Sequence, residues 1–417
     1  MTSLPEHRRS RRTTLVNPAT WCNVWLSLLA AALLVTSDRA AAETASSAKP
    51  LILAHYMPWY AAKPVSQSWG WHWTMNTWDP DQVVQEKRQI ASHYYPQIGP
   101  YDSGDPQLIE YHLLLMKLAG IDGVIVDWYG LQPFRDYAVL HRNTQRLVDQ
   151  VTRLEMKFAI CYEDQTIPAL VKAGRLKSEQ QVEHAAAELN WLSENWFSRS
   201  SYVRVDKRPV LLSFGQTGLT DQQWSDCLAR VTEPVAYFSQ HRRRTAAIGA
   251  FDWPIPEQGL AAISRFQTSA DAWKHAIPVA FPRFVDIYAE AKVHASWGTI
   301  ADHDGATFRK SMEQALTIDA PIIQIATWND WGEGTMIEPS LEFGFRDLEV
   351  VQQLRRKHLD AGFAATATDL QLPEQLYRLR RTTRQPNQIE QLDEVTELLA
   401  DGRVTEARAI LQELIEH

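Results

Sequence analysis

Short apolar segments alternate with longer amphipathic segments along most of this chain, and this alternation restricts the fold more than any other feature. Seven segments have the composition of buried strands: residues 51–56, 124–128, 158–162, 210–214, 247–251, 279–284 and 322–326. Helical periodicity marks residues 106–118, 142–154, 179–195 and 307–316. Apolar strands that alternate with helices predict a parallel sheet covered on both faces. Seven or eight such units in about 300 residues favour an α/β fold of the (β/α)8 TIM-like barrel type over an open sheet, with the strand between residues 284 and 321 the least defined.

Aromatic and acidic residues follow these strands, at the end where a barrel places its active site. The strand ends and the loops after them contribute Tyr56, Trp59, Tyr60, Asp127, Trp128, Tyr129, Glu163, Trp253 and Asn329. The first long loop adds a further aromatic cluster that includes His72 and Trp73. Flat apolar faces mixed with carboxylates and amides are what a carbohydrate site needs. We therefore predict that these residues bind a polysaccharide or oligosaccharide.

The segment TWNDWGEGTMIEP, residues 327–339, places Asp330 and Glu333 three residues apart directly after the last strand. Cleaving an acetal bond needs one protonated carboxyl group and a second that is ionised. Gly332 and Gly334 relax the backbone, so that Glu333 is presented to the site rather than buried. Burial or the charge of Asp330 must raise the pKa of Glu333 if it is to donate a proton near neutral pH. The residues alone also fit an exposed acidic turn, and Glu338 fits a structural role.

The first 42 residues have the features of an export signal. A basic region with four arginines at positions 8–12 precedes an apolar stretch at 24–35 and three alanines at 40–42. The apolar stretch is short for a membrane span, so we expect a cleaved signal and a periplasmic or extracellular protein without a membrane span in the mature chain. An uncleaved anchor and a twin-arginine route remain open.

Charge and motifs exclude several classes of function. Loss of residues 1–42, which carry five arginines and two acidic residues, takes the net charge from −8 to −11 and leaves 375 residues. No basic face is available for nucleic acid. Only Cys161 and Cys227 remain, too few for a disulfide scaffold. No zinc or nucleotide motif is present, and residues 302–305 (DHDG) fit a helix cap better than a calcium loop, so we predict no metal and no cofactor.

Residues 388–417 differ in character from the preceding chain. Apolar residues at helical spacing mark two amphipathic helices joined by a turn at Asp401 and Gly402. A single helical hairpin cannot bury its own apolar face. We expect it either to pack on the barrel or to bind a partner protein.

Four segments in matching order resemble the group formed by glycoside hydrolase families 99 and 71. They are HYMPWY at 55–60, YYPQIGPYDSGDP at 94–106, HLLLMKLAGIDGVIVDWYG at 112–130 and WNDWGEGTMIEP at 328–339. The resemblance spans roughly residues 50–350. It implies a (β/α)8 barrel, here over residues 50–369, that cleaves α-linked glycans such as mannans or glucans. Tyr56, Trp59, His72 and Trp128 match aromatic or histidine positions of the group.

The same resemblance implies roles for the two carboxylates. In family 99 the last motif reads like WNEWHEGT; its second Glu, matched by Glu333, is the general acid. Its first Glu removes the proton of the sugar 2-hydroxyl, and Asp330 stands there instead. The loss of one C–C bond, about 1.5 Å, makes room for an attacking water, and Gly332 in place of the family His opens further space.

Three classes of function fit the sequence. The first is an exported glycoside hydrolase that uses Asp330 and Glu333. The second is a glycan-binding protein on the same barrel without turnover, which the change from Glu to Asp at position 330 suggests. The third is a structural or surface-assembly protein that binds partners through its terminal hairpin.

Overall fold

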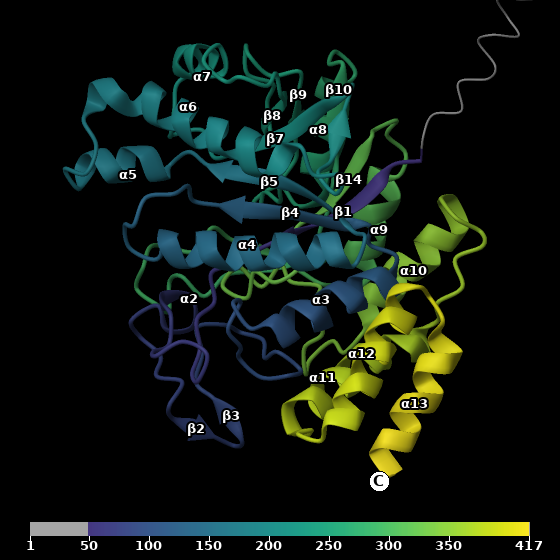
Figure 1. The fold of residues 1–417 in the computed structure, drawn as a ribbon. Helices are drawn as coiled ribbons and strands as arrows, with labels where there is room; N and C mark the ends of the chain where they lie inside the picture. The colour runs from purple at the N-terminus through teal and green to yellow at the C-terminus, as the bar shows by residue number, and fades with distance from the viewer. Residues whose placement is uncertain (1–48, 417) are drawn as a thin grey trace, which may run out of the picture. The chain divides into compact units, whose positions relative to one another are not determined.

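The computed structural model describes residues 49–416 (Figure 1). The predicted export signal, residues 1–42, lies outside the described residues. The helices of residues 49–416 are too short or too polar to span a bilayer.

Parallel strands form a (β/α)8 barrel with the order β10-β9-β8-β7-β5-β4-β1-β14-β11. The bounds are β1 (Leu51–Tyr56), β4 (Gly123–Trp128), β5 (Lys157–Glu163), β7 (Arg208–Phe214), β8 (Ala236–Gln240), β9 (Gly249–Phe251), β10 (His275–Ile277), β11 (Val279–Ala280) and β14 (Ile322–Ile325). Only Pro278 separates β10, which pairs with β9, from β11, which pairs with β14. Proline has no N–H for the ladder. The two short segments therefore act as one interrupted strand that closes the ring.

Helices connect most of these strands and cover the outside of the barrel (Figure 1). They are α3 (Pro106–Ala119), α4 (Tyr137–Arg153), α5 (Thr166–Lys172), α6 (Gln181–Leu192), α7 (Asp221–Leu228), α8 (Leu260–Ala270), α9 (Ala306–Ala315) and α10 (Arg346–His358). The shorter elements are α2 (Trp71–Thr74), β2 (Val83–Val84), β3 (Lys87–Arg88), η2 (Ser178–Gln180), η3 (Ser193–Phe197), β6 (Arg204–Val205), β12 (Phe284–Val285) and β13 (Thr299–Ile300).

Local sequence signals explain where α3 begins and ends. The side chain of Asp105 caps the helix by accepting a hydrogen bond from the N–H of Gln107, and Pro106 occupies the first turn. Gly120 ends it in the left-handed conformation with φ +85°. Together these residues fix the helix against which the C-terminal region packs.

The structure confirms the predicted barrel and corrects its second half. The strand expected at 279–284 is divided between β11 and β12, and β12 pairs with β13 in an antiparallel arrangement outside the barrel. The prediction missed β8, which ends in Ser239 and Gln240, and β10, which is three residues long. Short or partly polar strands do not produce the apolar pattern on which the prediction relied.

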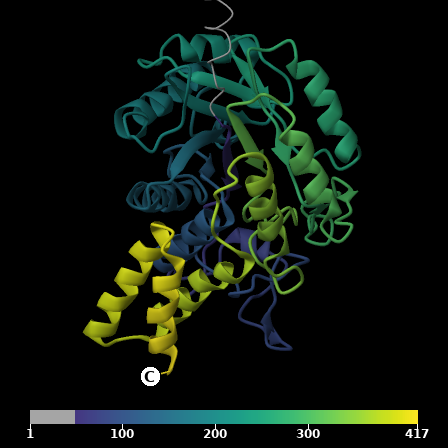
Figure 2. The ribbon, with the colours of Figure 1, turned by 90° about the vertical axis from the view of Figure 1, so that its right-hand side faces the viewer.

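Three C-terminal helices follow the barrel (Figure 2). After η4 (Ala367–Gln371) they are α11 (Leu372–Thr382), α12 (Pro386–Ala400) and α13 (Val404–Glu416). Glu110 of α3 accepts hydrogen bonds from Arg380 of α11 at 2.6 Å and from Thr396 of α12 at 3.0 Å. The expectation that the hairpin packs on the barrel is thus confirmed, and α11 is an additional helix that packs on both α3 and the hairpin. A protein partner for this region stays a prediction.

Candidate active site

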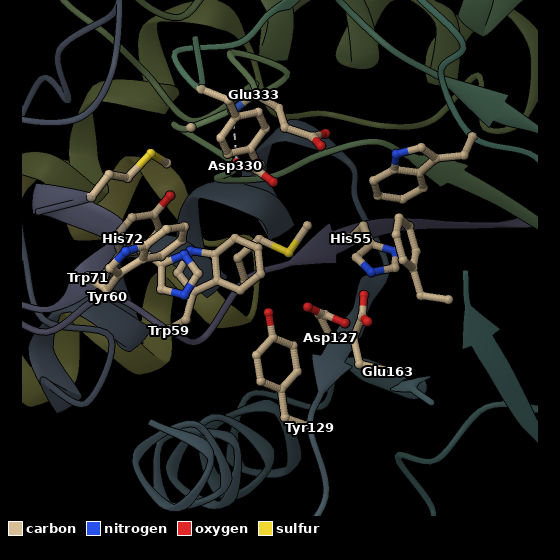
Figure 3. Close-up of a pocket in the computed structure, with 16 residues that line it drawn as sticks. His55, Trp59, Tyr60, Trp71, His72, Asp127, Tyr129, Glu163, Asp330 and Glu333 are labelled. Atoms are coloured by element: carbon tan, nitrogen blue, oxygen red, sulfur yellow. Dashed lines mark hydrogen bonds between the residues drawn. The ribbon is translucent and has the colours of Figure 1, made fainter. Parts of the chain in front are cut away.

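A cavity of about 190 Å³ opens at the C-terminal ends of the barrel strands (Figure 3). Its lining residues are His55, Met57, Trp59, Tyr60, Trp71, His72, Met75, Asp127, Tyr129, Glu163, Phe214, Trp253, Tyr288, Asp330, Gly332 and Glu333. The lining contains four carboxyl groups and no lysine or arginine. We call it the carboxylate pocket.

The loop after β14 presents Asp330 and Glu333 to this pocket. The N–H of Glu333 donates to Oδ1 of Asp330 at 3.0 Å, and the N–H of Asp330 donates to Oγ1 of Thr327 at 2.8 Å. The carbonyl of Glu333 accepts from the N–H of Val285 at 2.9 Å. Gly334 has φ +67°, and a Cβ there would lie 2.7 Å from the carbonyl oxygen of Val285. Only glycine fits this close approach, which fixes the direction of Glu333.

Proton affinities differ between these two carboxyl groups. Burial raises the pKa of Asp330 to about 6, although the N–H groups of Glu333 and Gly332 oppose the increase. Burial, followed by the charge of Asp330, raises the pKa of Glu333 well above its ordinary value. Oε2 of Glu333 is buried without a hydrogen-bond partner. Asp330 therefore loses its proton at about pH 6, whereas the raised pKa of Glu333 favours its protonated form.

A second carboxyl pair, Asp127 at the end of β4 and Glu163 at the end of β5, lies on the opposite side of the pocket (Figure 3). Burial is the main cause that raises the pKa of both, followed by the charge of Asp330 for Asp127 and by the charge of Asp127 for Glu163. Oδ1 of Asp127 has no hydrogen-bond partner. The raised pKa values favour the protonated forms of this pair, and Oδ1 of Asp127 is an unused acceptor.

His55 lies beside this second pair (Figure 3). Burial lowers the pKa of His55 to about 3, so the ring is neutral. Both ring nitrogens are buried without a hydrogen-bond partner. Buried polar groups are normally paired, so these ring nitrogens can bind water or a polar ligand in the cavity.

Aromatic side chains form another wall of the pocket. Trp59 stacks on His72 with ring centroids 4.1 Å apart and an interplanar angle of 7°. Burial lowers the pKa of His72, opposed by nearby Asp136. Trp71 is 39% exposed, and Nε1 of Trp59 has no partner. This wall combines a flat apolar surface with an unpaired donor, as sugar binding requires.

Two residues predicted to bind substrate point away from the pocket. The hydroxyl of Tyr56 is hydrogen-bonded to Nδ1 of His112 on α3 at 3.0 Å. Nε1 of Trp128 donates a hydrogen bond to Nδ1 of His141 on α4 at 3.2 Å. Neighbouring residues of a strand face opposite sides. Because His55 and Asp127 face the inside of the barrel, Tyr56 and Trp128 face the helices.

Trp73 and Asn329 also have packing roles. Trp73 is fully buried and donates to the carbonyl of Tyr101 at 2.7 Å. The side chain of Asn329 accepts from the N–H of Met57 at 2.8 Å and donates to its carbonyl at 3.0 Å. Asn329 therefore joins the loop after β1 to the carboxylate loop, and its amide is already used.

Seven lining residues were not predicted: His55, Met57, Trp71, Met75, Phe214, Tyr288 and Gly332. Strand alternation could have identified His55, because His55 and its neighbour Tyr56 in β1 must face opposite sides of the strand. Met75 and Tyr288 come from irregular segments without a sequence signal. A Cβ on Gly332 would lie 2.9 Å from Cε of Met75. The space expected beside Gly332 is therefore filled, because this unrelated loop supplies a methionine there.

Glu338 does not line the pocket but forms hydrogen bonds with residues around it. Its Oε2 accepts from the hydroxyl of Tyr101 at 2.6 Å and from Nε1 of Trp331 at 3.2 Å, and its Oε1 lies 3.1 Å from Nε2 of His112. These contacts support the structural role expected for Glu338. Trp331 is fully buried and belongs to the core.

Two clusters are relevant to the prediction that no metal binds. Among the described residues, ligand atoms of His55, Asp127 and Cys161 lie within 4.8 Å of one another inside the barrel. Burial raises the pKa of the Cys161 thiol, which keeps it protonated. Asp302 instead binds Arg283 at 3.0 Å and Arg346 at 2.6 Å. Asp302 thus serves an ion-pair network, and the absence of a metal stays a prediction.

Comparisons with known proteins match this architecture. The profile described as glycosyl hydrolase family 99 matches residues 48–230. A glycoprotein endo-alpha-1,2-mannosidase-like protein of Mus musculus is 30% identical over 327 residues, which cover 69% of this chain and 69% of the relative. The corresponding protein of Danio rerio is 21% identical over 321 residues, covering 68% and 69%. The solved structure of the GH99 endo-alpha-mannosidase from Bacteroides thetaiotaomicron in complex with bis-tris-propane has a TM-score of 0.59 at 18% identity, covering 76% of this chain and 100% of that chain. That structural likeness shows the fold.

Proposed function

This chain belongs to glycosyl hydrolase family 99 and is a glycoside hydrolase, and from that premise we propose that it cleaves α-linked mannose glycans in the carboxylate pocket. The endo-alpha-mannosidase names of its relatives support this substrate class. An α-glucan is the alternative that the sequence leaves open.

Glu333 is the general acid in this proposal. Its pKa is raised by burial and by Asp330, so it holds a proton near neutral pH. Its Oε2 has no other partner and can donate that proton to the glycosidic oxygen as the C–O bond breaks. The leaving sugar then departs as an alcohol rather than as an alkoxide.

Asp330 is the general base, because its pKa of about 6 leaves it ionised at neutral pH. Two routes are consistent with this role. In the first, Asp330 takes the proton of the sugar 2-hydroxyl, and that oxygen displaces the leaving group to give a 1,2-anhydro sugar, which water then opens with net retention. In the second, Asp330 takes a proton from water, which attacks the anomeric carbon directly with inversion.

The observation that carries this proposal is geometric: two adjacent carboxyl groups line one pocket, Oδ1 of Asp330 accepts from the N–H of Glu333, and Oε2 of Glu333 has no partner. The raised pKa of Glu333 and the pKa of about 6 for Asp330 agree with it. A pair of titratable groups with separated pKa values is the arrangement that acid–base catalysis needs. The unpaired atoms of His55 and Asp127 support a ligand rich in hydroxyl groups.

The test is incubation of the purified protein with a panel of α-mannans and α-glucans. We expect sugar release from α-mannan, which chromatography detects. NMR of the first-formed anomer distinguishes the two routes. Sugar release from α-glucan alone would replace the substrate class. Absence of release from every glycan, together with measurable binding, would favour the second candidate, a glycan-binding protein, which the Asp at position 330 motivates.

We further propose that the enzyme acts in the periplasm or outside the cell, on the strength of the signal-like residues 1–42. Cell fractionation with and without these residues tests this. Retention of the full chain in the cytoplasm would contradict it.

A further inference from the structure

Three side chains that can bind a metal ion meet inside the barrel, at the inner end of the carboxylate pocket. They are His55 on β1, Asp127 on β4 and Cys161 on β5. One ligand atom of each lies within 4.8 Å of the other two, and all three residues are buried. Asp127 and Cys161 are direct partners in the pairing of β4 with β5. Strands hold these groups in place more firmly than loops would. We call them the His–Asp–Cys cluster.

The ligand atoms of this cluster are not used by other residues of the described chain, 49–416. Both ring nitrogens of His55 and Oδ1 of Asp127 are buried without a hydrogen-bond partner. The thiol of Cys161 is free of any disulfide. Buried polar atoms are normally paired, so three unused groups around one space call for an occupant. A metal ion accepts lone pairs from all three, whereas a sugar hydroxyl gains little from a thiol, which is a weak donor and a weak acceptor.

The charge of the pocket favours a cation. Its lining contains four carboxyl groups, those of Asp127, Glu163, Asp330 and Glu333, and no lysine or arginine. Negative charges repel strongly where water is scarce, and a divalent cation among them relieves that repulsion. His55 and Asp127 line the pocket, so an ion can reach the cluster through its mouth.

The mixture of nitrogen, oxygen and sulfur atoms selects the type of metal. Ca²⁺ and Mg²⁺ take oxygen ligands, whereas Zn²⁺ takes imidazole, thiolate and carboxylate together. Tetrahedral zinc holds such ligands about 3.3–3.6 Å from one another. Atoms that already lie within 4.8 Å of one another need only small side-chain movements to reach this spacing.

We propose that the His–Asp–Cys cluster is a zinc site, with water from the pocket as its fourth ligand. Zn²⁺ bonds to a ring nitrogen of His55, a carboxylate oxygen of Asp127 and the sulfur of Cys161, and the thiol proton passes to the solvent. Because two of these ligands line the pocket, the bound ion takes space and acceptors from the sugar. Zinc is then an inhibitor of the enzyme. This inhibition rests on the proposed function, whereas the binding of zinc does not.

The first experiment is a calorimetric titration of the purified protein, freed of metal by a chelator, with Zn²⁺. We expect one tight site per chain. Cys161→Ser and Cys161→Ala should each weaken binding by at least about tenfold, because loss of a ligand costs no less than loss of a group that only orients one. Cys227→Ser is the matched control, because Cys227 is also buried and free but lies on α7, outside the cluster. Ca²⁺ should bind far more weakly than Zn²⁺.

Co²⁺ in place of Zn²⁺ tests for the sulfur ligand directly, because a bond from cobalt to thiolate gives strong near-ultraviolet absorption. We expect this absorption in the wild type and in Cys227→Ser, and its loss in both Cys161 variants. Thermal unfolding without metal shows that each variant is folded. Absence of zinc binding by the wild type would overturn the proposal, as would equal zinc affinity in the folded Cys161 variants or Ca²⁺ binding as tight as that of Zn²⁺.

Turnover then tests the inhibition. Zn²⁺ should lower kcat/KM on α-mannan for the wild type and for Cys227→Ser, and Cys161→Ala should keep its activity at the same zinc concentration. Zinc binding that leaves turnover unchanged would reject the inhibition. If the metal-free protein cleaves no glycan, the proposed function fails, and the calorimetric and absorption results still decide whether the zinc site exists.

Discussion

Two carboxyl pairs of identical composition, one Asp and one Glu each, face each other across the carboxylate pocket (Figure 3). Asp330 receives backbone N–H groups that keep its pKa at about 6, whereas the pKa of Glu333 is raised further. Asp127 and Glu163 are both raised well above their ordinary values, and Oδ1 of Asp127 has no donor at all. Backbone donors on one carboxylate therefore separate a pair into acid and base, and their absence leaves a pair suited to hydrogen bonding with hydroxyls.

The largest expected effect comes from removing the acid. Glu333→Gln keeps the shape but cannot donate the proton, so we expect kcat on α-mannan to fall by about 10³-fold. Glu163→Gln, the same chemical change across the pocket, is the matched control and should have a much smaller effect. Equal losses in kcat for the two variants would break the distinction between the pairs.

Removing the base should have the next largest effect. Asp330→Asn keeps the acceptor for the N–H of Glu333 but cannot take a proton, so we expect kcat to fall by about 10²- to 10³-fold. Circular dichroism should show an unchanged fold. A variant that retained more than half of the activity would show that Asp330 only positions the loop.

The pH dependence of kcat/KM should report the same separation. Asp330 must be ionised, so kcat/KM should rise with pH until it levels off above about 6, and should fall about tenfold per unit below. Glu333 must be protonated, so kcat/KM should fall again at higher pH, beyond its raised pKa. A profile that stays level from pH 4 upwards would contradict the role of Asp330.

The opposite pair should affect binding more than chemistry. Asp127→Asn replaces one of the two carboxyl oxygens, one of which is unpaired, by an NH₂ group that cannot accept a hydrogen bond from a sugar hydroxyl, and we expect kcat/KM to fall by about tenfold with little change in the pH profile. Measurement of KM and kcat separately checks this. If Asp127→Asn no longer lost activity at low pH, the general base would instead lie on this side of the pocket.

The sequence predicted the barrel and all four pocket carboxylates, because parallel strands bring their C-terminal ends to one face. It did not predict which of His55 and Tyr56, or of Asp127 and Trp128, faces the pocket, although neighbouring residues of a strand face opposite sides. Met75 and Tyr288 could not be predicted, because they reach the pocket from irregular segments far from the carboxylates in sequence. The break at Pro278 was hidden because its flanking strands are too short for a clear pattern.

The smallest expected change in activity tests this alternation at the end of β4. Trp128→Phe removes the hydrogen bond to His141 and buried volume on the outer face, so we expect the free energy of unfolding to fall by about 1–3 kcal/mol. Its kcat/KM should stay within about twofold of the wild type, because no atom of Trp128 lines the pocket. Tyr129, one residue further along, lines the pocket. Tyr129→Phe should therefore lower kcat/KM with little change in stability. Thermal unfolding and kinetics measure the two effects. If Trp128→Phe lowered kcat/KM and Tyr129→Phe lowered stability instead, the face of β4 assigned to the pocket would be wrong.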